Sequence, residues 1–442
     1  METLKPSSPT PSHLKTFTLS FLDQVFPPFH MPFLLFYATE TPRNDNTTEI
    51  LKSSLIQTLT QFYPLTGRFI DESTMSCNDE GVPFIETRVN SRLTDFLTMS
   101  PKLELLPELL PPKNLPCLGS RPISELTPLA FQINVFACGG VVIGCYMLHK
   151  VLDTASLGTF FKYWAGLVKN QAQDANLVGP NFDAIVKAFP PRPTVEPVLA
   201  PDRVNGPPKN IIPSFVVLVR CFKITKTAIT SLKAMAVSGA VPGPTSFEAV
   251  AGFVWENVMA AACMARDQST PKDAVLSMSM NMRPRTNPPL PKESMGNCTT
   301  IVQAKAKMLE TTLKELVGKI HDVILKAKPK IEKFQRENGI EEICLDIKET
   351  TRIIMDENSC VYHLSSWCNL GLNEADFGFG KPTWIVPTDA NPPPSLRNSI
   401  LFTDYSDSSG DDGIEVWLFL EEKEMHFLES NQGFLDYAFP NY

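Results

Sequence analysis

The sequence predicts an α/β protein made of two similar-sized, mixed α/β domains. Its 442 residues exceed the roughly 100–200 residues that one hydrophobic core usually organises. Strand-like and helix-like apolar patterns alternate in both halves of the chain, and a proline-rich stretch separates the halves. We therefore expect an N-terminal domain over residues 1–175, a crossover loop over residues 176–214 and a C-terminal domain over residues 215–442.

In the first half, two helical patterns enclose a group of strands. Apolar residues recur at helical spacing in Thr47–Tyr63, and this pattern ends before Pro64. Short alternating or continuous apolar runs predict strands over residues 75–77, 82–89, 129–136 and 141–148. The last two strands flank a Gly-Gly turn and should form a hairpin. A buried helix should then carry Leu157–Val168, with Asp153 or Thr154 as its N-cap.

The segment that joins the halves is rich in proline. Nine prolines fall within residues 175–214, at positions 180, 190, 191, 193, 197, 201, 207, 208 and 213. Each proline fixes φ and lacks a backbone N–H donor. We therefore expect a long crossover without regular secondary structure.

The second half again alternates strands with helices. The apolar patterns predict strands over residues 215–222, 360–368, 399–403 and 414–420, and helices over residues 224–238, 246–264 and 309–324. Lysines accompany the third helix at positions 305, 307, 314, 319, 326 and 328. We expect these lysines on the solvated face of that helix.

The composition is that of a soluble globular protein, with 43% hydrophobic and 20% charged residues. A net charge of −8 argues against nucleic acid as a partner. No run reaches the ~18 apolar residues of a membrane span, and the N-terminus lacks the apolar segment of a signal peptide. The ten cysteines show no metal-ligand spacing. We therefore expect a reduced, cytoplasmic monomer that binds no metal, nucleic acid or membrane.

The strongest chemical signal is His149, which follows a buried-strand pattern and precedes Asp153 in an HxxxD motif. An imidazole can deprotonate an alcohol, because its pKa lies near physiological pH. Attack of that alcohol on a thioester would form an oxyanion, which needs preorganised donors. The spacing alone is weak, and a structural histidine explains it about equally well. Asp153 is favoured as a helix cap or salt-bridge residue. The other histidines considered lie in polar or amphipathic settings without an evident partner, at positions 13, 30, 321 and 426.

A second unusual element is Asp376-Phe-Gly-Phe-Gly380. Alternating glycines and aromatic residues predict a tight, close-packed turn, because glycine reaches backbone conformations that other residues avoid. This element is expected to shape the fold or to allow close approach of a ligand, and it is no acid–base motif.

Further motifs follow one another along the whole chain. They are Pro6–Pro11, Leu19–Asp23, Phe62–Arg68, Cys77–Phe84, Phe136–Gly140, Asn281–Arg283, Pro288–Pro291, Met295–Asn297 and Ser365–Trp367. With the HxxxD and Asp376–Gly380 elements, their order and spacing resemble those of the plant BAHD acyltransferase family. The resemblance implies the two-domain fold of CoA-dependent acyltransferases of the chloramphenicol acetyltransferase type, with an active-site channel at the domain interface.

The resemblance also implies the substrates and the catalytic residues. An acyl-CoA would be the cosubstrate, a small-molecule alcohol would be the acceptor, and no cofactor would be bound permanently. His149 would be the general base, and Ser365 with the Trp367 indole would steady the oxyanion. Thr245 and Ser246 would contact CoA, since a helix N-terminus suits a phosphate.

Structural roles near the site also follow from the resemblance. Asp153 and Asp376 would be structural, the latter together with Gly378 and Gly380. Arg283 would pair with Asp153 or with Asp376, and the sequence leaves both alternatives open. Position 379 is phenylalanine where the family usually has tryptophan, so we expect an effect on stability more than on catalysis.

Within this family, the sequence most resembles the branch that contains vinorine synthase and related alkaloid acetyltransferases. The features that support this are Pro6–Pro11 and His149–Asp153. They imply acetyl transfer from acetyl-CoA to a hydroxyl of an alkaloid or terpenoid. The alternatives are transfer of a longer acyl chain or of malonyl to a sugar or other alcohol, a hydrolase in which His149 activates water, and a catalytically silent BAHD-like binding protein.

Overall fold

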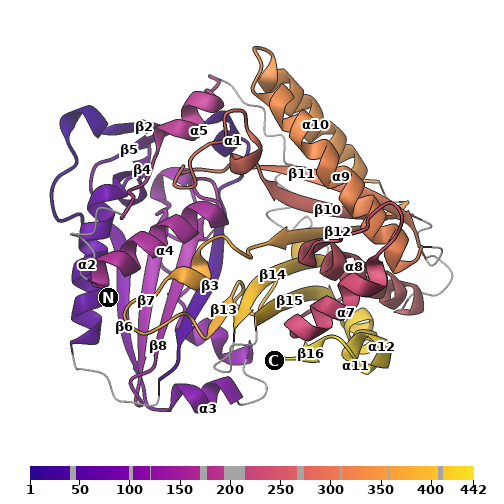
Figure 1. Cartoon of the computed structure of the whole chain (residues 1–442). Coiled ribbons are helices and arrows are strands. Elements are labelled where there is room, and N and C mark those ends of the chain that lie inside the picture. The colour runs from indigo at the N-terminus through magenta and orange to yellow at the C-terminus, as the bar shows by residue number, and fades with distance from the viewer. Residues whose placement is uncertain are drawn as a thin grey trace. The chain divides into compact units, whose positions relative to one another are not determined.

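The computed structural model describes residues 1–39, 46–98, 103–119, 121–169, 177–193, 215–265, 273–308, 311–356, 358–406 and 412–442. Contacts within the chain define two compact units. Unit 1 comprises Met1–Leu199, Pro289–Cys298 and Asn369–Ala390, and unit 2 comprises Ala200–Pro288, Thr299–Cys368 and Asn391–Tyr442. Each unit combines helices with its own large mixed sheet (Figure 1). The predicted α/β class is therefore confirmed.

A six-stranded sheet of order β1-β6-β7-β8-β3-β13 forms the centre of unit 1. Its strands are β1 (Glu2–Leu4), β3 (His30–Tyr37), β6 (Val82–Val89), β7 (Leu129–Phe136), β8 (Val141–Leu148) and β13 (Trp384–Val386). A small second sheet contains β2 (Thr16–Thr18), β4 (Arg68–Phe69) and β5 (Thr74–Ser76). β7 and β8 form the predicted hairpin. β8 is buried along its whole length, which explains its unbroken apolar run.

The helices of unit 1 include two long ones that pack together. The α-helices of unit 1 are α1 (Phe21–Gln24), α2 (Thr47–Gln61), α3 (Leu93–Thr98), α4 (Thr154–Val168) and α5 (Asp183–Ala188), and α2 and α4 are the two long ones. The 3₁₀ turns are η1 (Ser12–Leu14), η2 (Tyr63–Thr66), η3 (Leu103–Leu109), η4 (Ile123–Glu125) and η7 (Leu372–Glu374). α4 crosses one face of the large sheet and contacts α2 (Figure 1). Its buried side carries Leu157, Phe160, Phe161 and Trp164, the stripe that the sequence predicted.

Part of the predicted crossover is regular, which corrects the expectation that prolines exclude secondary structure there. α5 occupies the interval between Pro180 and Pro190, where no proline interrupts the backbone hydrogen bonds. Just before it, Asn181 forms a parallel bridge with Ser294. The other residues of the crossover, 176 and 194–214, lie outside the described residues.

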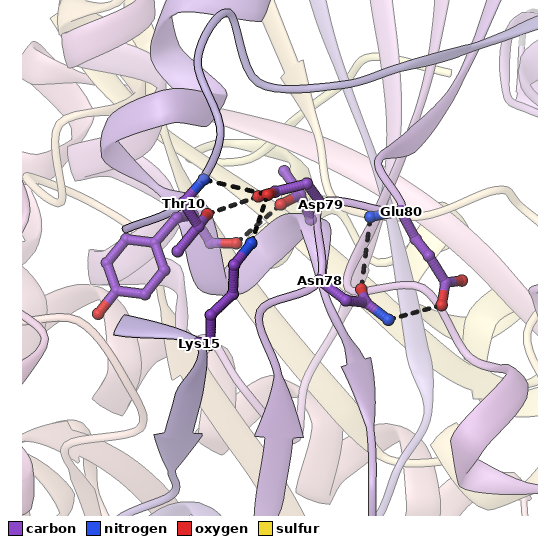
Figure 2. A network of polar contacts seen from close by, with 7 residues as sticks. Thr10, Lys15, Asn78, Asp79 and Glu80 are labelled. Carbon is purple, nitrogen blue, oxygen red and sulfur yellow. Dashed lines mark hydrogen bonds and ion pairs between the residues drawn. The ribbon is translucent and has the colours of Figure 1, made fainter. Parts of the chain in front are cut away.

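A polar network fixes the N-terminal segment within unit 1 (Figure 2). The Asp79 carboxylate accepts hydrogen bonds from the Thr10 N–H at 3.0 Å and from its hydroxyl at 2.5 Å. The Lys15 ammonium donates to the same carboxylate at 2.8 Å. Beside it, the Asn78 amide donates to Glu80 at 2.7 Å. The network therefore joins the start of the chain to the loop before β6.

Unit 2 is built on a seven-stranded sheet of order β11-β10-β12-β14-β15-β9-β16. The strands are β9 (Val217–Thr225), β10 (Asp273–Asn281), β11 (Thr299–Lys307), β12 (Ser359–Ser366), β14 (Ser399–Ser406), β15 (Asp412–Glu421) and β16 (Phe439–Pro440). The sequence did not predict β10 and β11. Lys305 and Lys307 lie on β11 and not on the following helix, which begins only at Leu313.

The helices of unit 2 are α7 (Lys226–Ala236), α8 (Ser246–Ala265), α9 (Leu313–Phe334), α10 (Gly339–Ile354), α11 (Glu422–Ser430) and α12 (Gln432–Leu435), with 3₁₀ turns η6 (Arg283–Arg285) and η8 (Pro394–Leu396). α8 is long and apolar enough to cross a membrane by length and composition, but 72% of that apolar window is buried. It contacts α7, α9 and α11. α8 is therefore placed as a core helix of unit 2.

Two short segments join unit 1 although they come late in the chain. β13 pairs with β3, and this pairing groups residues 369–390 with unit 1. Asp376–Gly380 thus belongs to unit 1, whereas the sequence placed it in a continuous C-terminal domain over residues 215–442. The difference arises because the segment is held by the pairing of β13 with β3, a strand far away in the sequence. Local sequence patterns do not predict pairing between such distant strands.

Candidate active site

His149 directly follows β8, and two other segments of unit 1 hold it. Its N–H donates to the Phe29 carbonyl at 2.9 Å, and its own carbonyl accepts from the Asn297 amide at 2.8 Å. Its imidazole stacks on the Phe26 ring, with centroids 4.8 Å apart and planes inclined by 7°. The Phe29 ring lies 5.2 Å away at 43°. Both the backbone and the ring of His149 are therefore constrained.

The surroundings of His149 favour a neutral imidazole. Burial lowers its pKa from the ordinary 6.5, although the Asp153 charge and the hydrogen bonds around His149 act in the opposite direction. Its Nδ1 atom is buried and has no hydrogen-bond partner among the described residues. A neutral imidazole at physiological pH can accept a proton, which is the state that a general base requires.

Asp153 is a buried structural carboxylate at the end of the same turn. One of its oxygens accepts from the Ser156 N–H at 2.9 Å and caps α4, so the predicted N-cap is confirmed. The other oxygen accepts from the Cys298 N–H at 3.0 Å. Asp153 therefore ties the turn after His149 to both α4 and the segment 294–298.

Asp23 and Asn297 belong to this arrangement, although the sequence gave them no role. Asp23 accepts from the Asn297 N–H at 2.6 Å and from its side-chain amide at 3.0 Å. That same amide donates to the His149 carbonyl. Burial raises the pKa of Asp23 to about 6, against the hydrogen bonds from Ser20 and Asn297 that lower it. Both residues stand in the motifs Leu19–Asp23 and Met295–Asn297, and a buried polar residue in an apolar motif is the signal that could have found them.

Asp376 organises its own glycine-rich turn. Its carboxylate accepts from the N–H groups of Gly378 and Gly380 at 2.9 and 2.8 Å. Both glycines have positive φ, 81° and 86°, which other residues rarely adopt. Burial opposes ionisation of Asp376, but the Lys169 ammonium and the glycine N–H groups hold its pKa below the ordinary value. Lys169 forms an ion pair with Asp376. Pairing of Arg283 with Asp153 or with Asp376 stays a prediction.

The aromatic residues of this turn extend the core of unit 1. Phe377 is buried and packs edge-to-face on Trp164 of α4, with centroids 4.9 Å apart. Phe379 packs on Tyr37 of β3 at 5.8 Å. The Tyr37 hydroxyl in turn donates to the Ala375 carbonyl at 2.7 Å. This motif therefore attaches the late segment to the first sheet.

The other predicted site residues lie in unit 2. Ser365 lies on β12, opposite Leu401 of β14, and is partly buried. Trp367 is buried, and its backbone N–H donates to the Phe402 carbonyl at 2.8 Å. Arg283 is also buried, at the start of η6, and its N–H and guanidinium both donate to Asn281 Oδ1. The roles expected for these three residues stay predictions.

The start of α8 is already stabilised from within unit 2. Glu248 accepts from the Thr245 N–H at 2.7 Å and from its hydroxyl at 2.8 Å, and it also contacts His321 Nδ1 at 2.7 Å. The Thr245 hydroxyl oxygen in turn accepts from the Glu248 N–H at 3.2 Å and so caps the helix. Both Thr245 and Ser246 are exposed. Contact of these residues with CoA stays a prediction. His321 has a partner, contrary to the expectation from the sequence.

In the described part of the chain, no group of three or more His, Cys, Asp or Glu side chains could hold a metal ion. The ten cysteines form no disulfide with one another in the described part of the chain. Several of them are buried, including Cys138 and Cys145, and burial raises the pKa of Cys145 well above its ordinary value.

Comparison with known proteins identifies the family. A model of the Transferase family matches residues 1–435. Akuammiline synthase 2 of Alstonia scholaris is 34% identical over 448 residues, which cover 100% of this chain and 96% of that protein. Stemmadenine O-acetyltransferase of Catharanthus roseus is 33% identical over 446 residues, which cover 100% of this chain and 98% of that protein.

The fold is shared with a solved relative. The crystal structure of vinorine synthase aligns with a TM-score of 0.78 at 32% identity, and the match covers 99% of this chain and 97% of that chain. This likeness confirms the predicted fold. The chain belongs to the Transferase family, the plant BAHD acyltransferases.

Proposed function

We propose that this acyltransferase moves the acetyl group of acetyl-CoA to a hydroxyl of a plant alkaloid or terpenoid alcohol. The observation that carries the proposal is His149, whose imidazole is kept neutral by burial and is fixed by stacking on Phe26. A fixed, neutral imidazole next to a buried strand is suited to general-base catalysis.

The reaction needs one proton carrier and no covalent enzyme intermediate. His149 takes the proton of the acceptor hydroxyl as the oxygen attacks the thioester carbonyl. The C–S bond then breaks, and the imidazolium returns the proton to the CoA thiolate. The products are one ester and free CoA, and His149 is again neutral. Donors at the developing oxyanion would lower the barrier, and Ser365 and Trp367 keep the roles predicted for them.

The choice of acetyl and of an alkaloid acceptor is supported by the named relatives. Stemmadenine O-acetyltransferase is 33% identical over essentially its whole length, and vinorine synthase shares the fold at 32% identity. The motifs Pro6–Pro11 and His149–Asp153 point to the same branch. Transfer of a longer acyl chain or of malonyl is the alternative that the experiment below must separate.

Release of CoA thiol from acetyl-, malonyl- and longer-chain acyl-CoAs, with a panel of alkaloid, terpenoid and sugar alcohols, tests the proposal. We expect the fastest acceptor-dependent release with acetyl-CoA and an alkaloid or terpenoid alcohol. A preference for malonyl-CoA or for a sugar acceptor would contradict the proposal. Thiol release at an equal rate without any acceptor would show a hydrolase instead.

The pH dependence of kcat/KM should reveal the lowered pKa of His149. The base must be neutral, so the rate should be lost as the pH falls through the pKa of His149 in the free enzyme. Because burial lowers that pKa, the midpoint of the acid limb should lie below pH 6.5. A midpoint above 6.5 in the measured profile would show that a different group, or a solvated imidazole, controls the rate.

A further inference from the structure

We propose that Lys150 and Phe26 are positioning residues that hold the His149 imidazole in its working orientation. Phe26 and Phe29, whose rings both contact the imidazole, form an aromatic clamp. Lys150 follows His149 directly in the sequence, and its side chain fastens the segment that carries the clamp. This inference rests on the proposed function, because it assigns how the general base is oriented.

Lys150 is an unusual lysine, since it is only 2% exposed. Its ammonium donates to the carbonyls of Gln24 at 3.2 Å and of Phe26 at 3.1 Å. Glu72 lies 3.6 Å away but is largely exposed. Burial lowers the pKa of Lys150, against the raising effect of the Glu72 and Asp23 charges. Burying a lysine ammonium costs free energy. The hydrogen bonds to the two carbonyls offset part of this cost and fix the backbone of Gln24 and Phe26.

The N–H groups of the segment that Lys150 holds donate to carbonyls two to four positions earlier in the chain, those of Phe21, Asp23 and Pro27. Residues 25–29 lie between α1 and β3 and include Pro27 and Pro28, which lack N–H donors. Two contacts from the His149 turn reach this segment. The Lys150 ammonium binds the Phe26 carbonyl, and the His149 N–H binds the Phe29 carbonyl. The turn that carries the imidazole therefore also fixes both residues of the clamp.

The clamp acts on the imidazole ring itself. Phe26 is nearly parallel to it at 4.8 Å, and Phe29 contacts it at 5.2 Å. Stacking restricts rotation of the ring, and displacement of a reacting group by about 1 Å can cost about 10²-fold in rate. The face of Phe26 also lies within the roughly 6 Å at which an aromatic ring attracts a cation. It would therefore favour the imidazolium, which forms only as the reaction proceeds.

Four variants test this inference: Phe26→Leu, Phe26→Tyr, Lys150→Met and the double variant Phe26→Leu/Lys150→Met. We expect Phe26→Leu and Lys150→Met each to lower kcat about tenfold or more, with the KM for acyl-CoA changed less than about threefold. Phe26→Tyr restores a flat ring and should keep kcat within about threefold of wild type. Because Lys150 acts through Phe26, the double variant should be no more than about threefold slower than the slower single variant.

Matched controls separate positioning from general loss of stability. Phe17→Leu removes a partly buried ring on β2 that contacts Phe182 at 5.5 Å. Lys330→Met removes an ammonium that likewise binds a backbone carbonyl, of Ile301 at 2.9 Å, and a carboxylate, of Asp346. Both controls should keep kcat within about twofold of wild type, even where they lower the melting temperature by as much as the test variants do.

The inference is overturned if Phe26→Leu and Lys150→Met keep wild-type kcat, if Phe26→Tyr loses as much as Phe26→Leu, or if the two losses multiply in the double variant. If Lys150→Met does not fold, the comparison of Phe26→Leu with Phe26→Tyr decides. The outcome for the proposed function is separate. An inactive His149→Ala beside fully active Phe26→Leu and Lys150→Met would reject only the inference, whereas a fully active His149→Ala would reject both.

Discussion

Replacing His149 with alanine should lower kcat by about 10²–10⁴-fold, which is the usual contribution of a general base. The fold should persist, because the backbone hydrogen bonds of His149 do not need the ring. Steady-state kinetics and thermal unfolding of the same preparations would measure both effects. A variant that keeps more than about a tenth of the wild-type rate would be incompatible with a general-base role for His149.

His30→Ala is the matched control for this prediction. His30 lies on β3 opposite Leu148, the residue before His149. Its ring is already engaged, since Nε2 lies 2.8 Å from the Thr127 carbonyl, whereas the sequence gave it no partner. Burial also lowers the pKa of His30. If loss of His30 and not of His149 abolished turnover, the assignment of the base would be wrong.

Asp153→Ala should clearly destabilise the protein. It removes the cap of α4, which is typically worth about 1 kcal/mol. It also leaves the Cys298 N–H without its acceptor in a buried position, which costs about 1–3 kcal/mol. The free energy of unfolding should therefore fall by about 2–4 kcal/mol, and the melting temperature by about 5 °C or more.

Thr225→Ala provides the comparison for Asp153. Thr225 caps α7 through one hydrogen bond to the Ala228 N–H at 3.3 Å, so its loss should cost only the cap, about 1 kcal/mol. The melting temperature of Asp153→Ala should thus lie clearly below that of Thr225→Ala. A large loss of turnover in Asp153→Ala at an unchanged melting temperature would instead assign Asp153 a part in the chemistry.

Local patterns predicted the parts of the fold that local forces determine. The apolar run of β8, the helical stripe of α4 and the Asp153 cap were all evident in the sequence, because burial of a whole strand or of one helix face leaves a periodic trace. His149 was found for the same reason, since it stands where such a run ends. β3 was missed, although it pairs with β8 along its length.

Contacts between distant segments could not be predicted in this way. The bonds of Asp23 to Asn297 join residues 274 positions apart, and the ion pair of Lys169 with Asp376 spans 207 positions. Neither pair has a spacing that differs from chance. The stacking of Phe26 on His149 could not be predicted from the sequence either. The segment that carries Phe26 is irregular and contains prolines, so its apolar residues follow neither a helical nor a strand period. Such contacts depend on the folded chain as a whole.

The central claim is direct transfer of an acyl group from acyl-CoA to an alcohol, assisted by His149. The most direct test measures CoA thiol and O-acetyl ester together, from acetyl-CoA and an alkaloid alcohol, for the wild-type enzyme beside His149→Ala. We predict equal amounts of thiol and ester, formed only when the acceptor is present and lost in the variant. Thiol formed without ester, or ester formed at the wild-type rate by His149→Ala, would contradict the account.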